Sequence, residues 1–218
     1  MPDRKTKILL VDDHPLVREW LANLINQQPD LSVCGEAETV QEALDFMKTT
    51  VPDLAIVDIS LRESSGLDLI KSMKAAHPNV AVIVLSMHDE RHYAERAIRA
   101  GARGYVMKRE TTKKIISSIH QVLAGKLGVS EDVAALFAEK FVDSKPRTGT
   151  PVEELSDREL EVFRLLGQGL DTRTVATRLQ ISIKTVQAYC ARIKDKLNLA
   201  NANELLREAV RWSETDAF

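Results

Sequence analysis

Cysteine is scarce in this chain: Cys34 and Cys190 are the only two among 218 residues, and they lie far apart in the sequence. Two isolated thiols form no C-x-x-C pair, so we expect neither a disulfide framework nor a zinc site, and we expect a reducing compartment. The sequence also lacks an apolar run long enough to cross a bilayer, and residues 1–7 are polar. We therefore expect a cytoplasmic protein that makes no contact with a membrane.

An excess of charge of either sign is also missing. The formal net charge is −2, the isoelectric point is near 6.2, and 28% of the residues are charged, which is ordinary for a soluble protein. These values give no overall indication of nucleic-acid binding, so any basic surface must be local. A length of 218 residues, of which 44% are hydrophobic, favours two domains.

The first part of the chain, residues 7–125, alternates short apolar runs with longer amphipathic stretches, a pattern typical of buried parallel strands joined by helices. Strands are predicted at 8–11, 31–37, 54–57, 80–85 and 104–107. Helices are predicted near 15–27, 39–48, 66–75, 90–100 and 111–124. Five such repeats indicate an α/β domain with a doubly wound sheet, whose ligand site lies beyond the carboxyl ends of the strands.

The pattern changes at residue 126. One short helix is predicted at Glu131–Val142, and the residues after it are rich in turn formers, so we interpret 126–150 as a linker. Beyond the linker, residues 151–218 contain no strand-like run and predict an all-α domain of four helices.

Several local signals define the helices of this second domain. Ser156 and Glu159 have the spacing of a capping box at the start of the first helix, and Gly169 can end that helix with a positive φ. Two further helices, at about 172–179 and 183–197, are separated by a tight turn. This arrangement is the outline of a helix-turn-helix.

Five polar residues follow the apolar runs of the first domain: Asp12, Asp13, Asp58, Ser86 and Lys108. A carboxylate such as Asp58 can act as a nucleophile toward phosphorus when a divalent cation neutralises the charge between them. Asp12 and Asp13 would supply hard oxygen ligands for Mg²⁺. Lys108 adds a positive charge, and Ser86 offers a hydroxyl that can donate to a phosphoryl oxygen.

Each of these residues also has an ordinary interpretation. Asp12 and Asp13 alone could be a solvated pair or a cap before the helix that Pro15 opens, and an isolated Lys108 is usually a surface lysine. Their joint placement at successive strand ends is what favours a phosphate-handling site.

Four segments around these residues carry a family resemblance: Val-Asp-Asp-His-Pro at 11–15, Ile-Val-Asp-Ile-Ser at 56–60, Leu-Ser-Met-His-Asp-Glu at 85–90 and Ala-Gly-Ala-Arg-Gly-Tyr-Val-Met-Lys at 100–108. Together they resemble the receiver domain of bacterial two-component response regulators, and the last two resemble the NarL/FixJ subfamily. The resemblance implies a flavodoxin-like five-stranded parallel fold over residues 1–125. The loop at 61–66, Leu-Arg-Glu-Ser-Ser-Gly, lacks the proline that receivers often have there.

The resemblance also implies roles for individual residues. Asp58 would accept a phosphoryl group from a sensor histidine kinase. Asp12, Asp13 and Asp58 would bind Mg²⁺ together with the backbone carbonyl of Ser60.

The remaining pocket residues would transmit and stabilise the phosphorylated state. Ser86 and Tyr105 would form a switch pair, in which the hydroxyl moves toward the phosphoryl group and the aromatic ring turns inward. Lys108 would bind a phosphoryl oxygen. The protein would then be a transcription regulator rather than an enzyme, and a homodimer is expected on phosphorylation.

The second domain resembles the LuxR-type helix-turn-helix, on the strength of Leu-Ser-x-Arg-Glu-x-Glu-Val at 155–162, Val-Ala-x-x-Leu-x-Ile-Ser at 175–182 and Thr-Val at 185–186. The stretch 181–197 carries a local charge of +3, enough to anchor phosphates of double-stranded DNA. Gln187 could read an adenine edge, and Tyr189 could reach a phosphate. The DNA-contacting residues are predicted to be Lys184, Thr185, Gln187, Tyr189, Arg192, Lys194 and Lys196.

Two other functions stay open from the sequence. One is a phosphatase or phosphotransferase with an aspartate nucleophile, but the D-x-D signature of enzymes similar to the haloacid dehalogenases fits neither 12–14 nor 58–60. The other is a protein-binding regulator that keeps the fold and is never phosphorylated. The spacing of His88 and His92 resembles a zinc-protease helix, yet Asp89 stands where that motif has glutamate, so we do not predict a zinc site there.

Overall fold

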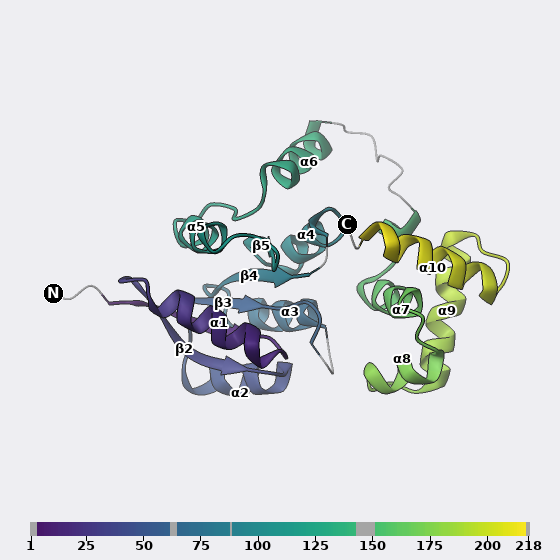
Figure 1. Ribbon diagram of the computed structural model, residues 1–218, viewed down its shortest axis with the longest axis horizontal. Coiled ribbons are helices and arrows are strands. Elements are labelled where there is room, and N and C mark those ends of the chain that lie inside the picture. The colour runs from purple at the N-terminus through teal and green to yellow at the C-terminus, as the bar shows by residue number, and fades with distance from the viewer. Residues whose placement is uncertain (1–3, 62–64, 88, 143–150, 217–218) are drawn as a thin grey trace. The chain divides into compact units, whose positions relative to one another are not determined.

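The computed structural model of the protein describes residues 4–61, 65–87, 89–142 and 151–216. It divides the chain into two compact units, Met1–Ala134 and Ala135–Phe218, each with buried side chains of its own. Figure 1 labels most of the helices and strands of both units. Within the described residues, no helix is both long and apolar enough to cross a membrane.

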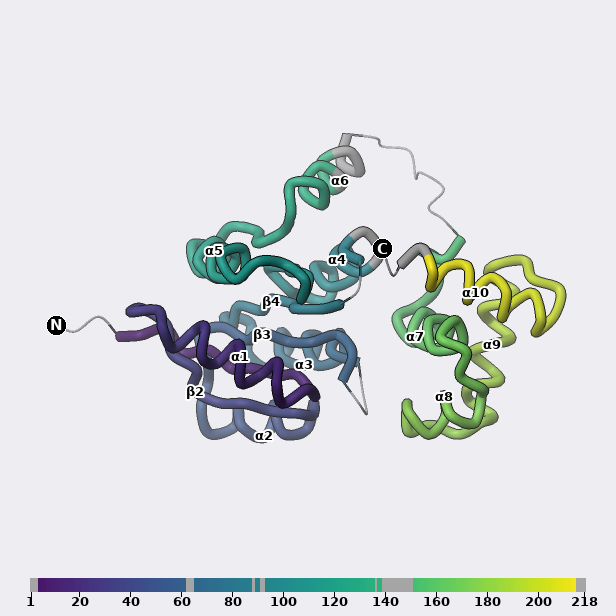
Figure 2. The backbone as a smooth tube through the Cα atoms, in the orientation of Figure 1, coloured from purple at the N-terminus to yellow at the C-terminus, as the bar shows by residue number. Residues whose placement is uncertain are grey.

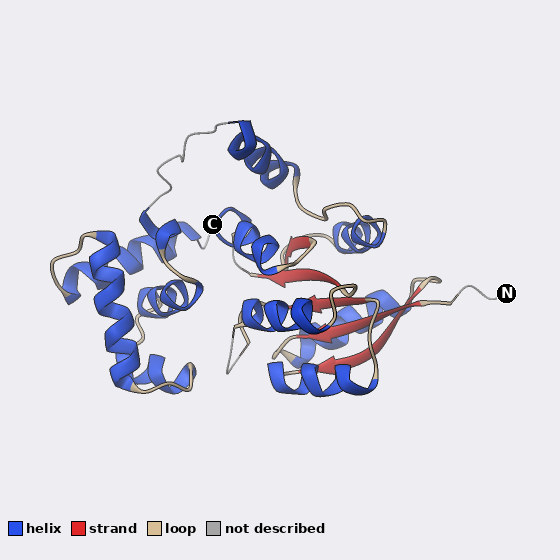
Figure 3. Cartoon of the chain, turned by 180° about the vertical axis from the view of Figure 1, so that it is seen from behind, coloured by secondary structure: helices blue, strands red, loops and turns tan. Residues whose placement is uncertain are grey.

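The first unit is built on one sheet of parallel strands. The strands are β1 (Thr6–Val11), β2 (Leu31–Ala37), β3 (Leu54–Val57), β4 (Ala81–Ser86) and β5 (Gly104–Met107). The strands are the red arrows of Figure 3. Their order in the sheet is β2-β1-β3-β4-β5. This is the strand order of the flavodoxin-like doubly wound fold, so the predicted fold class is confirmed.

Helices cover both faces of this sheet. Helices α1 (Pro15–Asn26) and α5 (Thr112–Leu123) lie on one face, and α2 (Val40–Thr49), α3 (Gly66–Ala76) and α4 (Glu90–Ala100) lie on the other (Figure 3). Because side chains alternate along a strand, Ile8 and Leu10 both reach the first face. There they form a fully buried cluster with Leu21 and Ile25 of α1 and Ile119 of α5.

The predicted boundaries agree with the structure to within two residues. Strand β1 begins two residues early because the N–H of Thr6 donates to the carbonyl of Asp30 at 2.8 Å and extends the pairing with β2. Strand β4 is shifted by one residue and continues to Ser86, which pairs with Met107 of β5. Helices α2, α3 and α5 begin after the side-chain caps Thr39, Ser65 and Thr111.

The segment that follows α5 pairs with β5 at the sheet edge, through a parallel bridge between Gly104 and Gly128, before it enters α6 (Glu131–Val142). Figure 2 shows the course of the backbone from α5 to α6. The carbonyl of Gly128 accepts from the N–H of Tyr105 at 2.9 Å, and the N–H of Gly128 donates to the carbonyl of Arg103 at 2.9 Å. Val133, in the first turn of α6, is 1% exposed. The first compact unit therefore extends beyond α5. The turn-forming run 143–150 of the predicted linker lies outside the described residues.

The second unit includes α6 from Ala135 onward and, after residue 150, the four helices that the sequence predicts, preceded by a short 3₁₀ helix. The elements after residue 150 are η1 (Pro151–Glu154), α7 (Asp157–Gly167), α8 (Thr172–Arg178), α9 (Ile183–Leu197) and α10 (Ala202–Asp216). Its core includes Phe163 of α7 and Trp212 of α10, whose ring centroids are 5.8 Å apart. Val175 of α8 and Ile193 of α9 are fully buried.

The first helix of this set, α7, begins at the predicted capping box and is followed by the predicted positive-φ glycine. The Ser156 side chain accepts from the N–H of Glu159, and the Glu159 carboxylate accepts from the N–H of Ser156 at 2.8 Å, so the capping box is present. Gly169 has a φ of +81°, the left-handed conformation that glycine adopts without strain. The turn between α8 and α9 contains Gln180 at a φ of 52°.

Helices α7 and α10 approach closely at Gly167, which supplies a test of the packing. Alanine normally favours a helix over glycine by about 1 kcal/mol. At this position, however, a Cβ would lie 2.1 Å from Ser213 Oγ and 2.3 Å from the backbone oxygen of Ala209. We expect Gly167→Ala to lower the free energy of unfolding of the second unit by about 1–3 kcal/mol, because the helices must separate to accept the methyl group.

The measurement is urea unfolding followed by tryptophan fluorescence in a Trp20→Phe background, where Trp212 is the remaining tryptophan. Ala191→Gly, at an exposed position of α9, is the control for helix propensity alone. An increased unfolding midpoint for Gly167→Ala would contradict the close approach of the two helices.

Candidate functional site

The hydrogen-bond register of the sheet places the predicted pocket residues at one edge. Asp12 follows β1, Asp58 follows β3, and Lys108 follows β5. The ladder continues into these residues: the N–H of Asp58 donates to the carbonyl of Val11 at 2.8 Å, and that of Lys108 donates to the carbonyl of Ser86 at 2.7 Å. The positions of their side chains are therefore set by the main chain of the sheet.

Lys108 connects the two carboxylates of Asp12 and Asp58. Its Nζ lies 2.6 Å from Asp12 Oδ2 and 2.7 Å from Asp58 Oδ2. Asp12 and Asp58 are 3% and 4% exposed, so this charge cluster is largely removed from water. The other oxygen of Asp58, Oδ1, accepts from the backbone N–H of Ser60 at 3.3 Å.

Burial dominates the electrostatics of Asp58. It raises the pKa of the Asp58 carboxyl to about 6, because the buried charged form is poorly solvated; the Lys108 ammonium opposes this shift and the neighbouring Asp12 adds to it. For Lys108, burial alone favours the neutral amine, but the attraction of Asp58 and the hydrogen bonds to both carboxylates outweigh it and raise its pKa. Lys108 therefore stays protonated.

The pocket also contains a set of groups that can bind a cation. Asp12, Asp13, His14 and Asp58 each offer a ligand atom, and these atoms lie within 4.8 Å of one another. Three of the four residues are buried carboxylates, the hard oxygen donors that suit Mg²⁺. The donor set fits a small divalent cation, because mutual repulsion would otherwise oppose ionisation of the three acids together.

Ser86 and Tyr105, the predicted switch pair, lie on neighbouring strands. Ser86 is fully buried at the end of β4, and Tyr105 of β5 is 2% exposed, with its ring inside the domain. In the β4–β5 register, Tyr105 pairs with Val84, two residues before Ser86. Ser86 and Tyr105 therefore occupy neighbouring positions on adjacent strands, close to the carboxyl ends of these strands. Residues 62–64 of the proline-free loop and His88 lie outside the described residues, as does the side chain of His92.

Three supporting residues were not identified from the sequence: His14, Arg18 and Gly66. Arg18 is 8% exposed, and its Nη1 donates to the backbone oxygen of Asp12 at 2.6 Å. A Cβ on Gly66 would lie 2.0 Å from the backbone oxygen of Asp58, so only glycine fits there. An arginine in the first turns of a helix and a glycine after a loop carry no sequence signal of such contacts.

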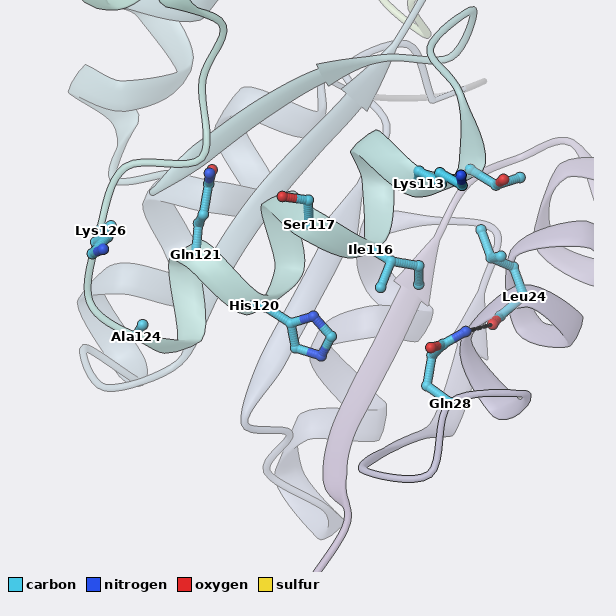
Figure 4. Close-up of a pocket in the computed structure, with 10 residues that line it drawn as sticks. Leu24, Gln28, Lys113, Ile116, Ser117, His120, Gln121, Ala124 and Lys126 are labelled. Atoms are coloured by element: carbon cyan, nitrogen blue, oxygen red, sulfur yellow. Dashed lines mark hydrogen bonds between the residues drawn. The ribbon is translucent and has the colours of Figure 1, made fainter.

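A separate groove lies along α1 and α5, away from the strand ends (Figure 4). It has a volume of about 630 Å³, and none of its lining residues is acidic. The residues that line it are Leu24, Gln28, Thr112, Lys113, Ile116, Ser117, His120, Gln121, Ala124 and Lys126. The groove contains none of the strand-end residues of the predicted phosphorylation pocket.

In the second unit, α8 and α9 form the predicted helix-turn-helix. Lys184, Gln187 and Arg192 of α9 are exposed. The guanidinium of Arg192 lies over the ring of Tyr189, 5.5 Å from its centroid, and this contact orients both side chains on the helix surface. Thr185 is half-buried, and its hydroxyl lies 2.8 Å from that of the capping residue Ser182.

Lys196 has a different environment from the other basic residues of α9. Its Nζ donates to Glu159 Oε2 at 2.7 Å and to the backbone oxygen of Glu154 at 3.1 Å. Glu159 is 3% exposed. Burial acts to raise the pKa of Glu159, but the hydrogen bonds from Lys196 and Ser156 outweigh it and lower the pKa. Lys196 therefore stabilises the capping box of α7.

An α/β domain with a buried Asp–Lys–Asp cluster at its strand ends, joined to a helix-turn-helix with a basic second helix, defines a class: a receiver domain linked to a DNA-binding module. Comparison with protein families agrees. Residues 8–120 match the response regulator receiver domain, and residues 153–209 match the luxR family of bacterial regulatory proteins. The chain belongs to the response regulators of two-component systems, in the group with a LuxR-type DNA-binding domain.

Curated relatives share this architecture over nearly the whole chain. The oxygen regulatory protein NreC of Staphylococcus carnosus is 30% identical over 94% of this chain and 97% of its own length. The nitrate/nitrite response regulator protein NarL of Escherichia coli is 28% identical over 90% of this chain and 91% of its own length. A solved structure of RcsB from Salmonella enterica serovar Typhimurium covers 95% of this chain and 100% of its own, with 23% identity and a TM-score of 0.69, which supports the fold.

The raised pKa of Asp58 predicts that the free energy of unfolding depends on pH, because ionising this buried carboxyl destabilises the folded state. Its folded pKa of about 6 exceeds the ordinary value of 3.8, so the folded state binds a proton between these values while the unfolded state does not. The contribution of Asp58 to stability therefore falls as the pH rises from about 4 to about 6. Without divalent cations, we expect Asp58→Asn to be more stable than the native protein at pH 7.5, by about 1–3 kcal/mol.

The measurement is urea unfolding in EDTA, followed by the fluorescence of Trp20 in a Trp212→Phe background, at several pH values. The gain should shrink as the pH is lowered from 6 to 4, where Asp58 is protonated in the native protein. Asp45→Asn changes an exposed carboxylate of the same unit and serves as the control. Equal or lower stability of Asp58→Asn at pH 7.5 would show that the buried charge carries no such cost.

Substitutions of Lys196 and Lys184 should have different effects, the first on the stability of the second unit and the second on DNA binding. We expect Lys196→Gln to lower the free energy of unfolding of the second unit by about 1–2 kcal/mol at pH 7, because Glu159 loses its charged partner. The pKa of Glu159 is depressed in the folded state, so this difference is present above its ordinary value of 4.5 and is lost as the pH falls through that region.

The exposed Lys184 provides the matched comparison. Lys184→Gln should leave the stability unchanged and reduce the slope of log affinity for DNA against log salt by about 1, as expected when one phosphate contact is lost. Fluorescence anisotropy with duplex DNA at several salt concentrations measures the slope. The reverse pattern, with Lys196 affecting the slope and Lys184 the stability, would refute these assignments.

Proposed function

We propose that Asp58 is the phosphoacceptor of this response regulator and that a sensor histidine kinase is the donor. A carboxylate oxygen of Asp58 forms a bond to phosphorus while the bond from phosphorus to the kinase imidazole nitrogen breaks, and the imidazole takes up a proton as it leaves. The observation that carries this proposal is the position of Asp58: a buried carboxylate 2.7 Å from Lys108 Nζ, at the open end of a parallel sheet.

The acidic residues beside Asp58 would hold Mg²⁺ during this transfer. Asp12, Asp13 and Asp58 would be the carboxylate ligands, with the backbone carbonyl of Ser60 completing the protein contribution. When bound, the ion would neutralise charge between the carboxylate and the phosphoryl oxygens. Lys108, already paired with two carboxylates, would turn one of its N–H groups to a phosphoryl oxygen.

Phosphorylation would then shift an equilibrium between two states of the protein. Ser86 would donate its hydroxyl to the new phosphoryl group, and Tyr105 would adjust behind it. The state that makes the more favourable contacts with the phosphoryl group becomes more populated. The size of this shift is set by the difference between the two states in their free energy of interaction with the phosphoryl group. The receiver would extend over 1–125 and the linker over 126–150, with 151–218 as the DNA-binding module.

The output would be a homodimer that places two recognition helices on two half-sites of a promoter. Lys184, Thr185, Gln187, Tyr189, Arg192 and Lys194 would contact DNA. The sequence also predicts a DNA contact for Lys196, but its ion pair with Glu159 supports a role mainly in stability. RcsB has been solved bound to a promoter in the presence of phosphomimetic BeF₃⁻, and by analogy we propose that phosphorylation and DNA binding are coupled in this protein. We place these reactions in the cytoplasm, where a kinase and DNA are both accessible.

Acetyl phosphate with Mg²⁺ tests this proposal in the full-length protein. We expect a covalent phosphoryl adduct on native protein, detected by intact mass and located at Asp58 by peptide mapping, and no adduct on Asp58→Asn. Phosphorylation should increase affinity for a promoter duplex about tenfold or more, within the usual range of coupling between two sites. Asp53→Asn, which changes a carboxylate at the start of β3, is the control.

The other outcomes point to the alternative functions. Continuous release of phosphate without an accumulating adduct would indicate an aspartate-nucleophile phosphatase. Absence of both adduct and turnover would indicate a regulator that is never phosphorylated. An adduct at Asp58 with unchanged DNA affinity would refute the gating step while leaving the phosphoacceptor assignment intact.

A further inference from the structure

His14 has a position that its role as the residue before α1 does not require. Its backbone N–H donates to Asp12 Oδ1 at 2.9 Å, and its ring Nδ1 lies 3.2 Å from the same oxygen. The same Nδ1 lies 2.8 Å from Asp13 Oδ1. The imidazole is 63% exposed, so it lies at the rim of the pocket, between the solvent and two buried carboxylates.

These distances are those between neighbouring ligands of one metal ion. In an octahedral site with metal–ligand distances of about 2.1 Å, adjacent ligand atoms are about 3.0 Å apart. The Nδ1 of His14 is within a few tenths of an ångström of this separation from one oxygen of each neighbouring carboxylate. His14 precedes α1 with an extended backbone, φ of −99° and ψ of 108°, and its ring lies against the two carboxylates.

The chemistry of imidazole differs from that of the other donors. Mg²⁺ takes oxygen ligands and keeps several waters, whereas imidazole nitrogen favours first-row transition ions such as Fe²⁺, Co²⁺, Ni²⁺ and Zn²⁺. A nitrogen donor beside three carboxylates therefore changes which ions the pocket prefers. It adds little to the binding of Mg²⁺ and more to the binding of a transition ion.

We propose that His14 is an additional ligand of the phosphorylation pocket and shifts its selectivity from Mg²⁺ toward imidazole-binding divalent transition ions. The ring binds through Nδ1, which requires the tautomer with its proton on Nε2, the nitrogen free to face solvent. This inference rests on the proposed function only in that the cation site is the same. It makes the occupancy of the pocket depend on which divalent ion is available.

The simpler interpretation is that His14 only donates a hydrogen bond to the two carboxylates. His14→Asn distinguishes the two, because an asparagine amide still donates to carboxylates but lacks the imidazole nitrogen. Since the side chain is largely exposed, the variant is expected to fold. His120→Asn is the matched control: His120 also pairs with an aspartate of the same unit, at 2.9 Å from Asp30 Oδ2, but outside the pocket.

The experiment titrates full-length native protein and both variants with CoCl₂ alone and with MgCl₂ alone. Visible absorption reports Co²⁺ coordination, and the shift of the Trp20 unfolding transition in a Trp212→Phe background reports binding of either ion. We expect His14→Asn to weaken Co²⁺ binding about tenfold or more and to alter the Co²⁺ spectrum, while Mg²⁺ binding changes less than about threefold. His120→Asn should behave as native protein in both titrations.

An unchanged ratio of Co²⁺ to Mg²⁺ affinity in His14→Asn would overturn the inference, as would an equal loss of Co²⁺ binding in His120→Asn. Phosphorylation by acetyl phosphate with Mg²⁺, measured on the same samples, separates this result from the proposed function. If His14 is not a ligand, the adduct on Asp58 still forms in every variant. If Asp58 is not the phosphoacceptor, the adduct is missing while the selectivity for Co²⁺ still depends on His14.

Discussion

The buried contact of Lys108 with Asp12 and Asp58 is the interaction on which the pocket of the first unit depends. Two carboxylates and an ammonium group leave water together, and the Lys108 ammonium, within 2.7 Å of an oxygen of each carboxylate, offsets part of the cost of burying them. Their placement requires all the intervening strands to keep their register, since the three residues are contributed by β1, β3 and β5. The same burial keeps Asp58 costly to ionise, as its raised pKa shows.

In the second unit, a buried carboxylate likewise pairs with one basic residue of α9, while other basic residues of the same helix stay exposed. Lys196 has a buried acidic partner, Glu159, and a backbone acceptor, so its charge is used within the domain. Lys184 and Arg192 are exposed on the same helix and remain accessible to phosphates. A charge count over α9 treats these residues as equivalent. Their environments differ, because Lys196 pairs with a buried carboxylate whereas Lys184 and Arg192 are exposed.

Much of the fold and pocket could be predicted because the signals are local. Buried strands appear as short β-branched runs, and the residue after each run must lie at the carboxyl edge of a parallel sheet, which identified Asp12, Asp58 and Lys108. The capping box at Ser156 and the positive φ of Gly169 are likewise set by neighbouring residues. Arg18 could not be found in this way, because its burial depends on the carbonyl of Asp12 and on carboxylates contributed by the end of β2 and the residues after it.

The sequence by itself determined the two-part architecture, the strand ends that carry the acidic pocket and the helix that presents basic residues. Periodicity, caps and turn residues act over a few positions, and they are readable wherever they occur. Only the tertiary structure decided which charges are paired, how far burial raises the pKa of Asp58, and that His14 reaches both neighbouring carboxylates. These properties depend on distances between side chains and on exclusion of water, which packing alone produces.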